Sequence, residues 1–581
     1  MRSSSVLAAC LAGLASAIDQ IIGLDLGLTP SLFPLEANAG TTNFFPMGKC
    51  GDFELEEATI DQMQAAMAAG NLTSVQLVVC YMLRNFQTDD YANAMIQMNP
   101  DALAIAAQMD AERAAGNVRG PLHGIPFIVK DNIASRDNME TTAGSWALLG
   151  SIVPRDAFVV KRLREAGAVL FGKATLSEWA DMRSNSYSEG YSARGGQCRS
   201  AYNLTKNPGG SSSGSAVGVS INAIAFALGT ETDGSVISPA ERAAIVGFKP
   251  TVGLTSRNGV IPESEHQDTV GTFGRTVRDA VYALDGIYGV DSRDNYTSAQ
   301  EGKTPDEGYA QYLATKCQLK GAVFGLPWNS FWVYASEEEQ SQLLELISLI
   351  EAAGATIVNN TEILDYETIV STDGWDWDWG NTRGGYVNES EYTVVKVDFY
   401  NNIKTYLSEL ENTNIRSLED IIAYDYANDG TEGGYAYGTK VGSAAFKSGQ
   451  DSFLASVATK GIQNETYWQA LEYTQTSTRN GIDYALNYNG TQLAGLLVPP
   501  EVGQTYQVAA QAGYPMITLP AGIFSATGMP FGLAIMQTAW AEAELIKWGS
   551  AIEDLQLKSG TQYKRTLPKW HNYLAKNIPV D

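Results

Sequence analysis

A serine-rich run between glycines is the first candidate for chemistry in this 581-residue chain: residues 207–218 read NPGGSSSGSAVG. The composition matches a flexible Gly/Ser linker. The run also contains G-x-S-x-G centred on Ser212, a pattern that places a nucleophilic serine on a sharp strand-to-helix turn. A third interpretation is a serine that relays protons without attacking a substrate. Because the preceding residues YNLTKNPGG favour a loop rather than a strand, the pattern argues against Ser212 as a nucleophile.

The chain offers few side chains that could activate a serine. Its histidines are His123, His266 and His571. A Ser-His-Asp site must use one of them, and Ser212 with His571 is the formal possibility. The cysteines lack zinc-ligand spacing, and Asp373, Asp376 and Asp378 lack the full spacing of a calcium loop. We therefore expect no metal and no cofactor.

A buried lysine is the alternative base. Burial disfavours the charged ammonium and lowers its pKa, so a neutral lysine can accept a serine proton near pH 7. Lys130 lies in the apolar run GIPFIVKDNI (124–133), which predicts a buried strand. An ion pair with Asp131 is the structural alternative, but neighbouring residues of a strand point to opposite faces. Lys173, after AVLFG, is a second candidate with weaker apolar flanks.

Helix and strand patterns alternate around these residues. Capping boxes at Thr59–Gln62 and Thr73–Gln76 begin two helices joined by a short turn. A helix is predicted over 156–167, a strand over 168–172, and a small-residue helix followed by a buried strand over 215–229. Later strands are predicted at residues 495–500, 514–522 and 530–537. The alternation predicts an α/β protein whose central sheet is covered by helices on both faces.

Residues from about 320 to 490 have a different character. They hold most of the N-glycosylation sequons and the aromatic-rich stretch STDGWDWDWGNTRGGYVNESEY. We interpret this range as an insertion with its own helices that lies over or beside the site. Because no internal repeat or long linker divides the chain, one large enzyme domain is predicted.

Five motifs follow one another in a fixed order: GIPFIVKDNI, NPGGSSSGSA, GTETDGSVISPA, VGFKPTVGLTSRNGVIP and FGRTVRDA. In this order they closely resemble the amidase signature enzymes, including fungal-type and peptide-amidase-like members. The resemblance runs from about residue 55 to 290 and resumes at GYPMITLPAG through AEAELIKWGSAIEDL, which leaves the insertion unmatched. It implies a large mixed β-sheet flanked by helices and a Ser-cisSer-Lys triad.

The resemblance implies a role for individual residues. The lysine of the family's strand motif falls on Lys130, the bridging cis-serine on Ser211, and the nucleophile on Ser235. Backbone N–H groups of Thr232, Asp233, Gly234 and Ser235 would form the oxyanion hole, where each donor contributes about 3–4 kcal/mol. Ser212 and Ser213 would then be loop structure.

The chain departs from the family pattern at three positions. Ser213 stands where the family most often has glycine, Asp233 replaces the first glycine before the nucleophile, and Ile237 stands where many members have arginine. The T-E-T-D-G-S form resembles a branch that includes peptide amidases, so it does not indicate loss of activity. Asp233 could be a hydrogen-bonded turn former or a contact for a substrate amine.

The N-terminus has the features of an export signal. MRSSSVLAACLAGLASAIDQ combines an early arginine, an apolar run and a small-x-small pattern, which predict a signal peptide over 1–17. Residues 18–54 would form an N-terminal extension, and 55–581 a single amidase domain. No later stretch reaches the roughly 20 apolar residues of a membrane helix. We therefore expect a secreted, extracellular protein without a membrane span.

Cysteines, sequons and charge agree with export. The four cysteines after the signal peptide are Cys50, Cys80, Cys198 and Cys317. They allow two disulfides in three connectivities, although Cys80 lies in an apolar run and could be a buried thiol. Sequons begin at Asn71, Asn203, Asn295, Asn359, Asn388, Asn464 and Asn489. The formal net charge of -26 disfavours nucleic acid and anionic lipid as partners.

The leading interpretation is a secreted amidase that hydrolyses a small-molecule or peptide carboxamide through an acyl-enzyme. An amidotransferase component that acts on charged tRNA resembles the same motifs, but export, sequons and charge argue against it. A catalytically inactive binding protein is the third alternative, because a fold does not guarantee its activity. The sequence leaves the substrate and the oligomeric state open.

Overall fold

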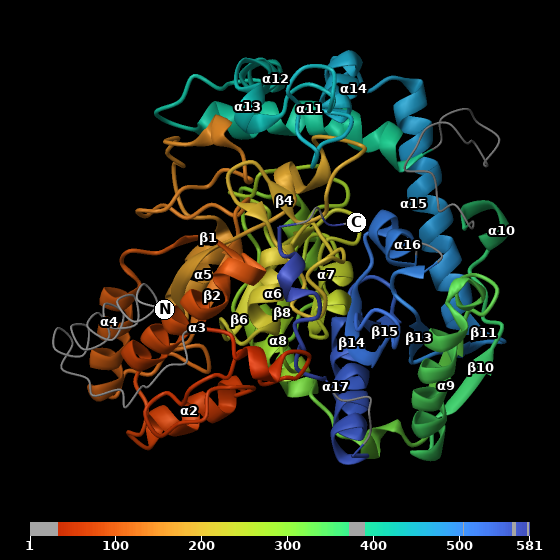
Figure 1. Cartoon of the computed structure of the whole chain (residues 1–581). Helices are drawn as coiled ribbons and strands as arrows, with labels where there is room; N and C mark the ends of the chain where they lie inside the picture. Colours follow the sequence, from red (N-terminus) through yellow and green to blue (C-terminus); the bar gives the residue numbers. More distant parts are fainter. Residues whose placement is uncertain (1–32, 371–389, 503–504, 561–564, 578–579, 581) are drawn as a thin grey trace.

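The apolar runs predicted as strands assemble into one 11-stranded sheet of order β1-β3-β2-β6-β8-β7-β14-β15-β13-β9-β10 (Figure 1). The structure is a computed structural model and describes residues 33–370, 390–502, 505–560, 565–577 and 580. The sheet strands are β1 (Met95–Met98), β2 (Pro126–Lys130), β3 (Val169–Ala174), β6 (Phe226–Glu231), β7 (Val246–Lys249), β8 (Thr269–Gly274), β9 (Val323–Leu326), β10 (Thr356–Asn359), β13 (Gly495–Val498), β14 (Met516–Ile523) and β15 (Pro530–Met536). The predicted signal peptide and Asp373, Asp376 and Asp378 lie outside the described residues.

The sheet is mixed, as the resemblance implied. β2 pairs in parallel with both β3 and β6, whereas β6, β8, β7, β14, β15 and β13 are successive antiparallel neighbours. All residues of β2, β3, β6, β8 and β15 are buried. Full burial explains why these strands are continuous apolar runs in the sequence rather than alternating patterns.

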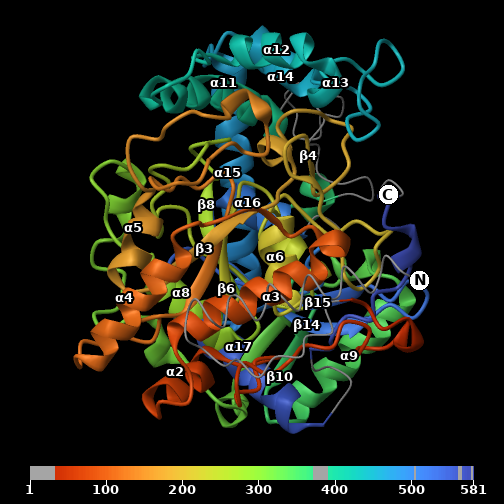
Figure 2. The same cartoon turned by 60° about the vertical axis from the view of Figure 1, so that its left-hand side comes forward.

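Helices cover both faces of the sheet (Figures 1 and 2). α6 (Ser213–Ser220) and α7 (Ile237–Arg242) contact each other, and α8 (Val277–Asp285) contacts α17 (Glu542–Lys558). The other helices are α2 (Ile60–Ala68), α3 (Ser74–Ala92), α4 (Ala102–Ala114), α5 (Phe158–Glu165), α9 (Glu337–Ala352), α10 (Tyr366–Ile369), α11 (Glu391–Glu409), α12 (Leu418–Ala427), α13 (Asp429–Glu432), α14 (Asp451–Thr459), α15 (Glu465–Leu486) and α16 (Thr505–Ala512). Two short hairpins add β4 (Tyr191–Ser192) with β5 (Gly196–Gln197), and β11 (Asn487–Tyr488) with β12 (Thr491–Gln492).

Both predicted capping boxes are present. The side chain of Thr59 accepts a hydrogen bond from the backbone of Gln62, and the Gln62 side chain accepts one from the backbone of Thr59. Thr73 and Gln76 make the same reciprocal pair at the start of α3. These pairs satisfy backbone donors that have no partner inside a helix, so each helix begins where the sequence predicted.

The predicted insertion over residues 320–490 is not wholly an insertion. β9 and β10 lie in this range, yet they pair in parallel with each other at one edge of the main sheet, and β9 also pairs with β13. Strands of four residues are too short to show a periodicity that separates them from a helix segment. The later part does form helices of its own: α11 to α14 lie together at one end of the molecule (Figures 1 and 2).

The N-terminal extension packs against the rest of the chain. Cys50 is disulfide-bonded to Cys80 on α3, so the alternative of a free thiol at Cys80 is wrong. Cys198 and Cys317 are free thiols, one buried and one exposed, so the described chain holds one of the two disulfides that the cysteine count allows. Phe45 is buried against Trp570 near the other end of the chain.

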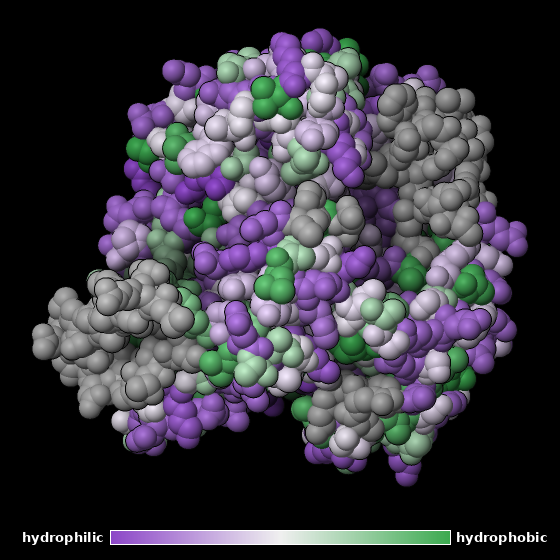
Figure 3. Space-filling model, viewed as in Figure 1, coloured by the Kyte–Doolittle hydropathy of each residue, from purple (hydrophilic) through white to green (hydrophobic). Residues whose placement is uncertain are grey.

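The surface is mixed in character. The face shown in Figure 3 intersperses polar and apolar residues without one large continuous apolar area. None of the helices in the described part of the chain combines the length and hydropathy that crossing a bilayer requires.

Candidate active site

Lys130 is the last residue of β2, and its side chain is fully buried. Its Nζ donates to the Oγ of Ser211 at 2.6 Å and to the Oγ1 of Thr230 at 2.9 Å. Burial is the main cause that lowers the pKa of Lys130 to about 8, against an opposing effect from nearby carboxylates. A lysine with this pKa exists partly as the neutral amine near pH 7, which is the form that can accept a proton.

Ser211 lies between the lysine and a second serine. The peptide bond between Gly210 and Ser211 is cis. The Ser211 Oγ donates to the Ser235 Oγ at 2.9 Å, and the Ser211 carbonyl accepts from the backbone N–H of Ser177 at 3.1 Å. A Cβ atom at position 210 would lie 1.8 Å from the Oε1 of Glu189, so a larger residue before this serine would have to displace the Glu189 side chain.

Ser235 sits in the turn between β6 and α7, with its side chain almost fully buried. Gly234 has a φ of 74°, a left-handed conformation that glycine adopts without strain. The ring of Tyr506 lies 2.5 Å from where a Cβ of Gly234 would be, so this turn also needs glycine for space. The turn directs the Ser235 hydroxyl at Ser211, and Lys130, Ser211 and Ser235 form one hydrogen-bonded chain.

The four predicted oxyanion donors are not equivalent. The carboxylate of Glu231 accepts from the backbone N–H groups of Val236 at 2.7 Å and Ile237 at 2.9 Å, and the N–H of Gly234 is directed at the same carboxylate. The N–H groups of Thr232, Asp233 and Ser235 are not used by hydrogen bonds within the described residues. Among the four predicted donors, Gly234 is the one whose N–H also interacts with the Glu231 carboxylate.

A cavity of about 270 Å³ opens beside Ser235. It is lined by Ala180, Asp181, Ser184, Asn185, Tyr187, Glu189, Gly210, Thr232, Asp233, Gly234, Ser235, Ser238, Glu263, Tyr506 and Gln507. The wall is mainly polar, and its residues come from segments before β4, before α6, after β6 and before β8, and from α16. A small molecule in this cavity would lie directly against the Ser235 side chain.

Comparison with known proteins identifies the family. The amidase family model matches residues 77–419. The chain belongs to the amidase family. A protein of Schizosaccharomyces pombe that is assigned by its name to the amidases is 59% identical over 564 residues, which cover 96% of this chain and 93% of the relative. The resemblance inferred from the five motifs is thereby confirmed.

Solved structures agree with this assignment. Native peptide amidase from Stenotrophomonas maltophilia is similar, with a TM-score of 0.75 and 36% identity over 88% of this amidase and 99% of that chain.

A glutamyl-tRNA(Gln) amidotransferase component from Symbiobacterium thermophilum is 38% identical over 291 residues, which cover 50% of this chain and 57% of that protein. The S. pombe relative matches this chain at higher identity and over a longer span than this amidotransferase component does.

The rival residues lie in other environments of the amidase. Ser212 precedes the first residue of α6, and its Oγ donates to the carbonyl of Thr230 at 3.1 Å. Lys173 has a pKa lowered to about 8 by burial, but its Nζ donates to the Ile133 carbonyl and the Thr141 hydroxyl rather than to a serine. A low pKa alone therefore does not distinguish Lys130 from Lys173, and the contact with Ser211 does.

The histidines make contacts that differ from those of a catalytic base. The Nε2 of His123 faces the Met109 carbonyl at 2.9 Å, and His571 packs against Gly528. His266 forms a cluster with Glu265 and Asp398 whose ligand atoms lie within 4.8 Å of one another. Both ring nitrogens of His266 face tyrosine hydroxyls, at 2.7 and 3.0 Å, so the cluster is occupied by hydrogen bonds within the protein.

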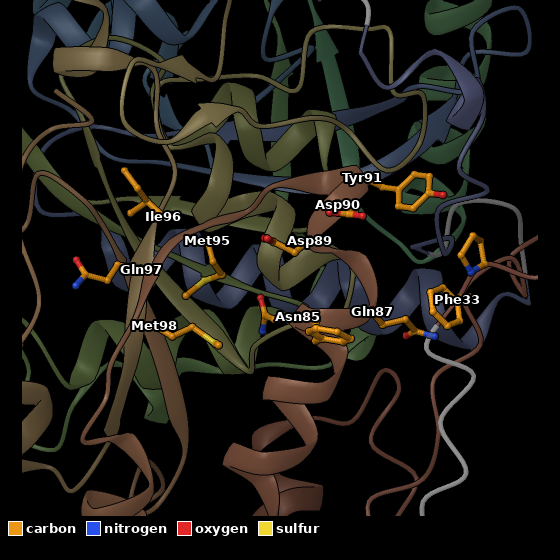
Figure 4. A pocket seen from close by; sticks show the side chains of 12 residues that line it. Phe33, Asn85, Gln87, Asp89, Asp90, Tyr91, Met95, Ile96, Gln97 and Met98 are labelled. Carbon is orange, nitrogen blue, oxygen red and sulfur yellow. The ribbon is translucent and has the colours of Figure 1, made fainter. Parts of the chain in front are cut away.

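A larger cavity of about 610 Å³ lies elsewhere, beside the edge strand β1 (Figure 4). Met95, Ile96, Gln97 and Met98 of β1 line it together with residues near the end of α3 and with Phe33. None of the residues predicted for catalysis is among its lining residues. Cavity size by itself would therefore point away from the serines.

Sequence reasoning missed several residues around the serines. Thr230 contacts Lys130, Glu189 packs on Gly210, and Glu391 meets the side chain of Asp233. Thr230 lies within the motif GTETDGS, so its position beside the predicted turn was a usable signal. Glu391 has no such signal, because it begins α11 in the region that the motifs do not cover.

Proposed function

We propose that this amidase is a secreted enzyme that hydrolyses carboxamide C–N bonds through a Ser-cisSer-Lys triad and an acyl-enzyme. The observation that carries the proposal is the pair of contacts from Lys130 to Ser211 and from Ser211 to Ser235, at 2.6 and 2.9 Å. Both distances are short enough for proton transfer between positioned groups. The cavity beside Ser235 provides the place where a substrate carbonyl can lie.

The first half of the reaction forms the acyl-enzyme. Neutral Lys130 takes the proton of Ser211, Ser211 takes the proton of Ser235, and the Ser235 Oγ bonds to the carbonyl carbon of the amide. The carbonyl oxygen becomes an anion that the free backbone N–H groups of the 232–235 turn can stabilise. When the C–N bond breaks, the proton returns through Ser211 to the leaving nitrogen, which departs as ammonia or amine.

The second half repeats the sequence with water. Water gives up a proton to the same serine and lysine relay as its oxygen bonds to the acyl carbon. The bond from the acyl carbon to the Ser235 Oγ then breaks, and the proton returns to Ser235 as the carboxylic acid leaves and ionises. The free enzyme is regenerated, and the reaction consumes only the amide and water.

Secretion is supported by several separate features. The predicted signal peptide over 1–17 is followed by sequons, and the Cys50–Cys80 disulfide is a type of bond that persists in oxidising compartments. Five of the sequon asparagines are exposed: Asn71, Asn295, Asn359, Asn464 and Asn489. We infer that the mature protein begins near residue 18 and acts outside the cell.

Labelling with a fluorophosphonate tests the proposed function. The probe bonds to an activated serine, so intact-mass measurement and peptide mapping should place one adduct on Ser235. Ser235→Ala should remove the adduct, and Ser212→Ala should keep it. An adduct on Ser212, or no adduct together with no ammonia release from any amide of a broad panel, would refute the proposed mechanism.

A further inference from the structure

The cavity beside Ser235 has an acidic wall. Asp181, Glu189, Asp233 and Glu263 line it, and no arginine or lysine is among its lining residues in the described part of the chain. Arg242, which lies near this region, donates to the carboxylate of Glu501 at 2.6 Å and is thereby neutralised. Lys130, which interacts electrostatically with Asp181, Glu189 and Glu263, is not itself in the wall, so an anionic substrate entering this cavity would lie directly against the carboxyl groups.

Three of these carboxyl groups belong to two carboxyl pairs. The side chain of Asp181 contacts that of Glu189, and the side chain of Asp233 contacts that of Glu391. Burial raises the pKa of both aspartates well above the usual range, and the neighbouring carboxyl raises it further. Two touching carboxyl groups do not both ionise, so each pair holds at most one negative charge and retains at least one proton.

The negative charge of each pair is held in place by other side chains. Ser177 donates its hydroxyl to Glu189 at 2.6 Å. Three glutamine amides surround Glu391: Gln267 and Gln507 donate at 2.6 Å, and Gln511 donates at 3.3 Å. These donors stabilise the ionised member of each pair.

The aspartates are less well satisfied. Apart from the proton that each pair shares, the buried Oδ1 atoms of Asp181 and Asp233 receive no hydrogen bond from the described residues. A buried acceptor without a donor is costly, so a ligand that supplies N–H groups gains free energy there. Each of these two Oδ1 atoms can therefore accept a hydrogen bond from a ligand. The negative charge of the pairs favours a ligand whose hydrogen-bond donor is positively charged.

We propose that this cavity binds amides that carry a protonated amine next to the scissile carboxamide, as in the amides of amino acids with a free α-ammonium group. An ammonium group brings three donors and a positive charge to the carboxylates of the two pairs. The rings of Tyr187 and Tyr506 are also in the wall and can attract a cation. The proposal rests on the proposed function and names its substrate class.

The size and polarity of the cavity agree with this class. Its volume of about 270 Å³ lies at the small end of ligand sites and suits a compact molecule. The mainly polar wall gives a long acyl chain little apolar surface to contact. The Asp233 side chain, which the sequence left open between a turn former and an amine contact, becomes a contact for the substrate cation.

Three substrates of matched shape test the proposal. Alaninamide carries an ammonium group where isobutyramide carries a methyl group and 2-methylmalonamate carries a carboxylate. At about pH 6.5 the α-amino group is mostly protonated. We expect kcat/KM for alaninamide to exceed that for isobutyramide by about tenfold or more, and 2-methylmalonamate to be the poorest substrate. Equal or faster hydrolysis of isobutyramide would overturn the proposal.

Matched variants test the assigned carboxyl groups. In Glu189→Gln, Glu391→Gln or both, which remove the ionised member of a pair, the ratio of the alaninamide to the isobutyramide kcat/KM should fall about tenfold. The ratio is the decisive readout, because a general loss of catalysis lowers kcat/KM for alaninamide and for isobutyramide by the same factor. Glu307→Gln, at an exposed glutamate outside the cavity wall, removes the same charge and should leave the ratio unchanged. An unchanged ratio in both pair variants would contradict the assignment.

Measuring amide binding to the Ser235→Ala variant tests the substrate inference independently of the proposed hydrolytic function. Calorimetry with alaninamide and isobutyramide on that variant measures recognition without hydrolysis. Tighter binding of alaninamide would support the cation site even if the wild-type protein hydrolysed no amide. If wild type hydrolyses amides but Ser235→Ala binds both molecules equally, the cation site is wrong and the amidase mechanism stands.

Discussion

At the scale of single residues, the two candidate serines differ in what they touch. The Ser235 hydroxyl lies in the chain that leads to Lys130, whereas the Ser212 hydroxyl donates to the Thr230 carbonyl. We expect Ser235→Ala to fold and to lose detectable amidase activity, and Ser212→Ala to remain active. Ammonia release measured beside the unfolding midpoint of each variant checks this. An inactive but folded Ser212→Ala would revive Ser212 as the nucleophile.

Lys130 should set the acid limb of the pH profile. The pKa of this buried lysine is lowered to about 8, and in the proposed mechanism the neutral amine is the active form, so kcat/KM should fall as pH drops below about 8. Lys130→Arg keeps the charge but stays protonated, so it should lose nearly as much activity as Lys130→Ala. Steady-state kinetics over a pH series measures the limb, with single-pH assays of the two variants.

The histidine control separates a lysine base from an imidazole base. His123 is buried seven residues before Lys130, and its Nε2 faces a backbone carbonyl. The acid limb should therefore persist in His123→Ala. Disappearance of the limb in that variant, or near-normal activity of Lys130→Arg, would remove lysine from the role of base.

At the scale of elements, α11 connects the helical part of residues 320–490 to the active-site turn. Glu391 at its start meets Asp233, and Asp398 further along accepts from Ser264 at 2.6 Å and from Tyr467 at 2.7 Å. Burial raises the pKa of Asp398 to about 7. The helix therefore brings the Glu391 carboxyl group against Asp233 of the cavity wall from a region that the sequence motifs do not cover.

The Cys50–Cys80 disulfide ties the N-terminal extension to α3. Its removal frees a loop of 30 residues in the unfolded chain. Cys50→Ser with Cys80→Ser should lower the free energy of unfolding by about 3–4 kcal/mol, because the cross-link restricts the unfolded state. Denaturant unfolding measures the change, and Cys317→Ser, at an exposed free thiol, serves as the control that should be silent. Equal stabilities of the double variant and the control would show that the disulfide contributes nothing.

At the scale of the whole molecule, the folded structure decides which sequons are accessible. Asn203 is buried, and its amide donates to the Thr527 carbonyl at 2.8 Å, whereas Asn71 and Asn464 are exposed. In protein secreted by a glycosylating host, we expect glycans at exposed sequons and none at Asn203. Peptide mapping by mass spectrometry after enzymatic deglycosylation checks each site. A glycan on Asn203, or bare asparagines at all exposed sequons, would contradict this.

The sequence by itself determined the parts of this protein that lie in short continuous segments. Lys130, Ser211 and Ser235 belong to three separate motifs, and each motif carries its own local structure: a buried strand, a glycine-rich turn and a strand-to-helix turn. The capping boxes and the fully buried strands were also predictable, because neighbouring residues alone determine helix starts and apolar runs.

Tertiary structure alone decided which distant side chains meet. Glu391 contacts Asp233, although Asp233 lies within a sequence motif and Glu391 lies outside all of them. The pairing of Cys50 with Cys80 was one of several pairings that the cysteine count allowed. The four-residue strands β9 and β10 find their place only at the sheet edge beside β13. Such contacts depend on how whole elements pack, and spacing along the chain carries no information about which faces come together. The acidic wall of the cavity, and with it the proposed substrate class, exists only in the folded molecule.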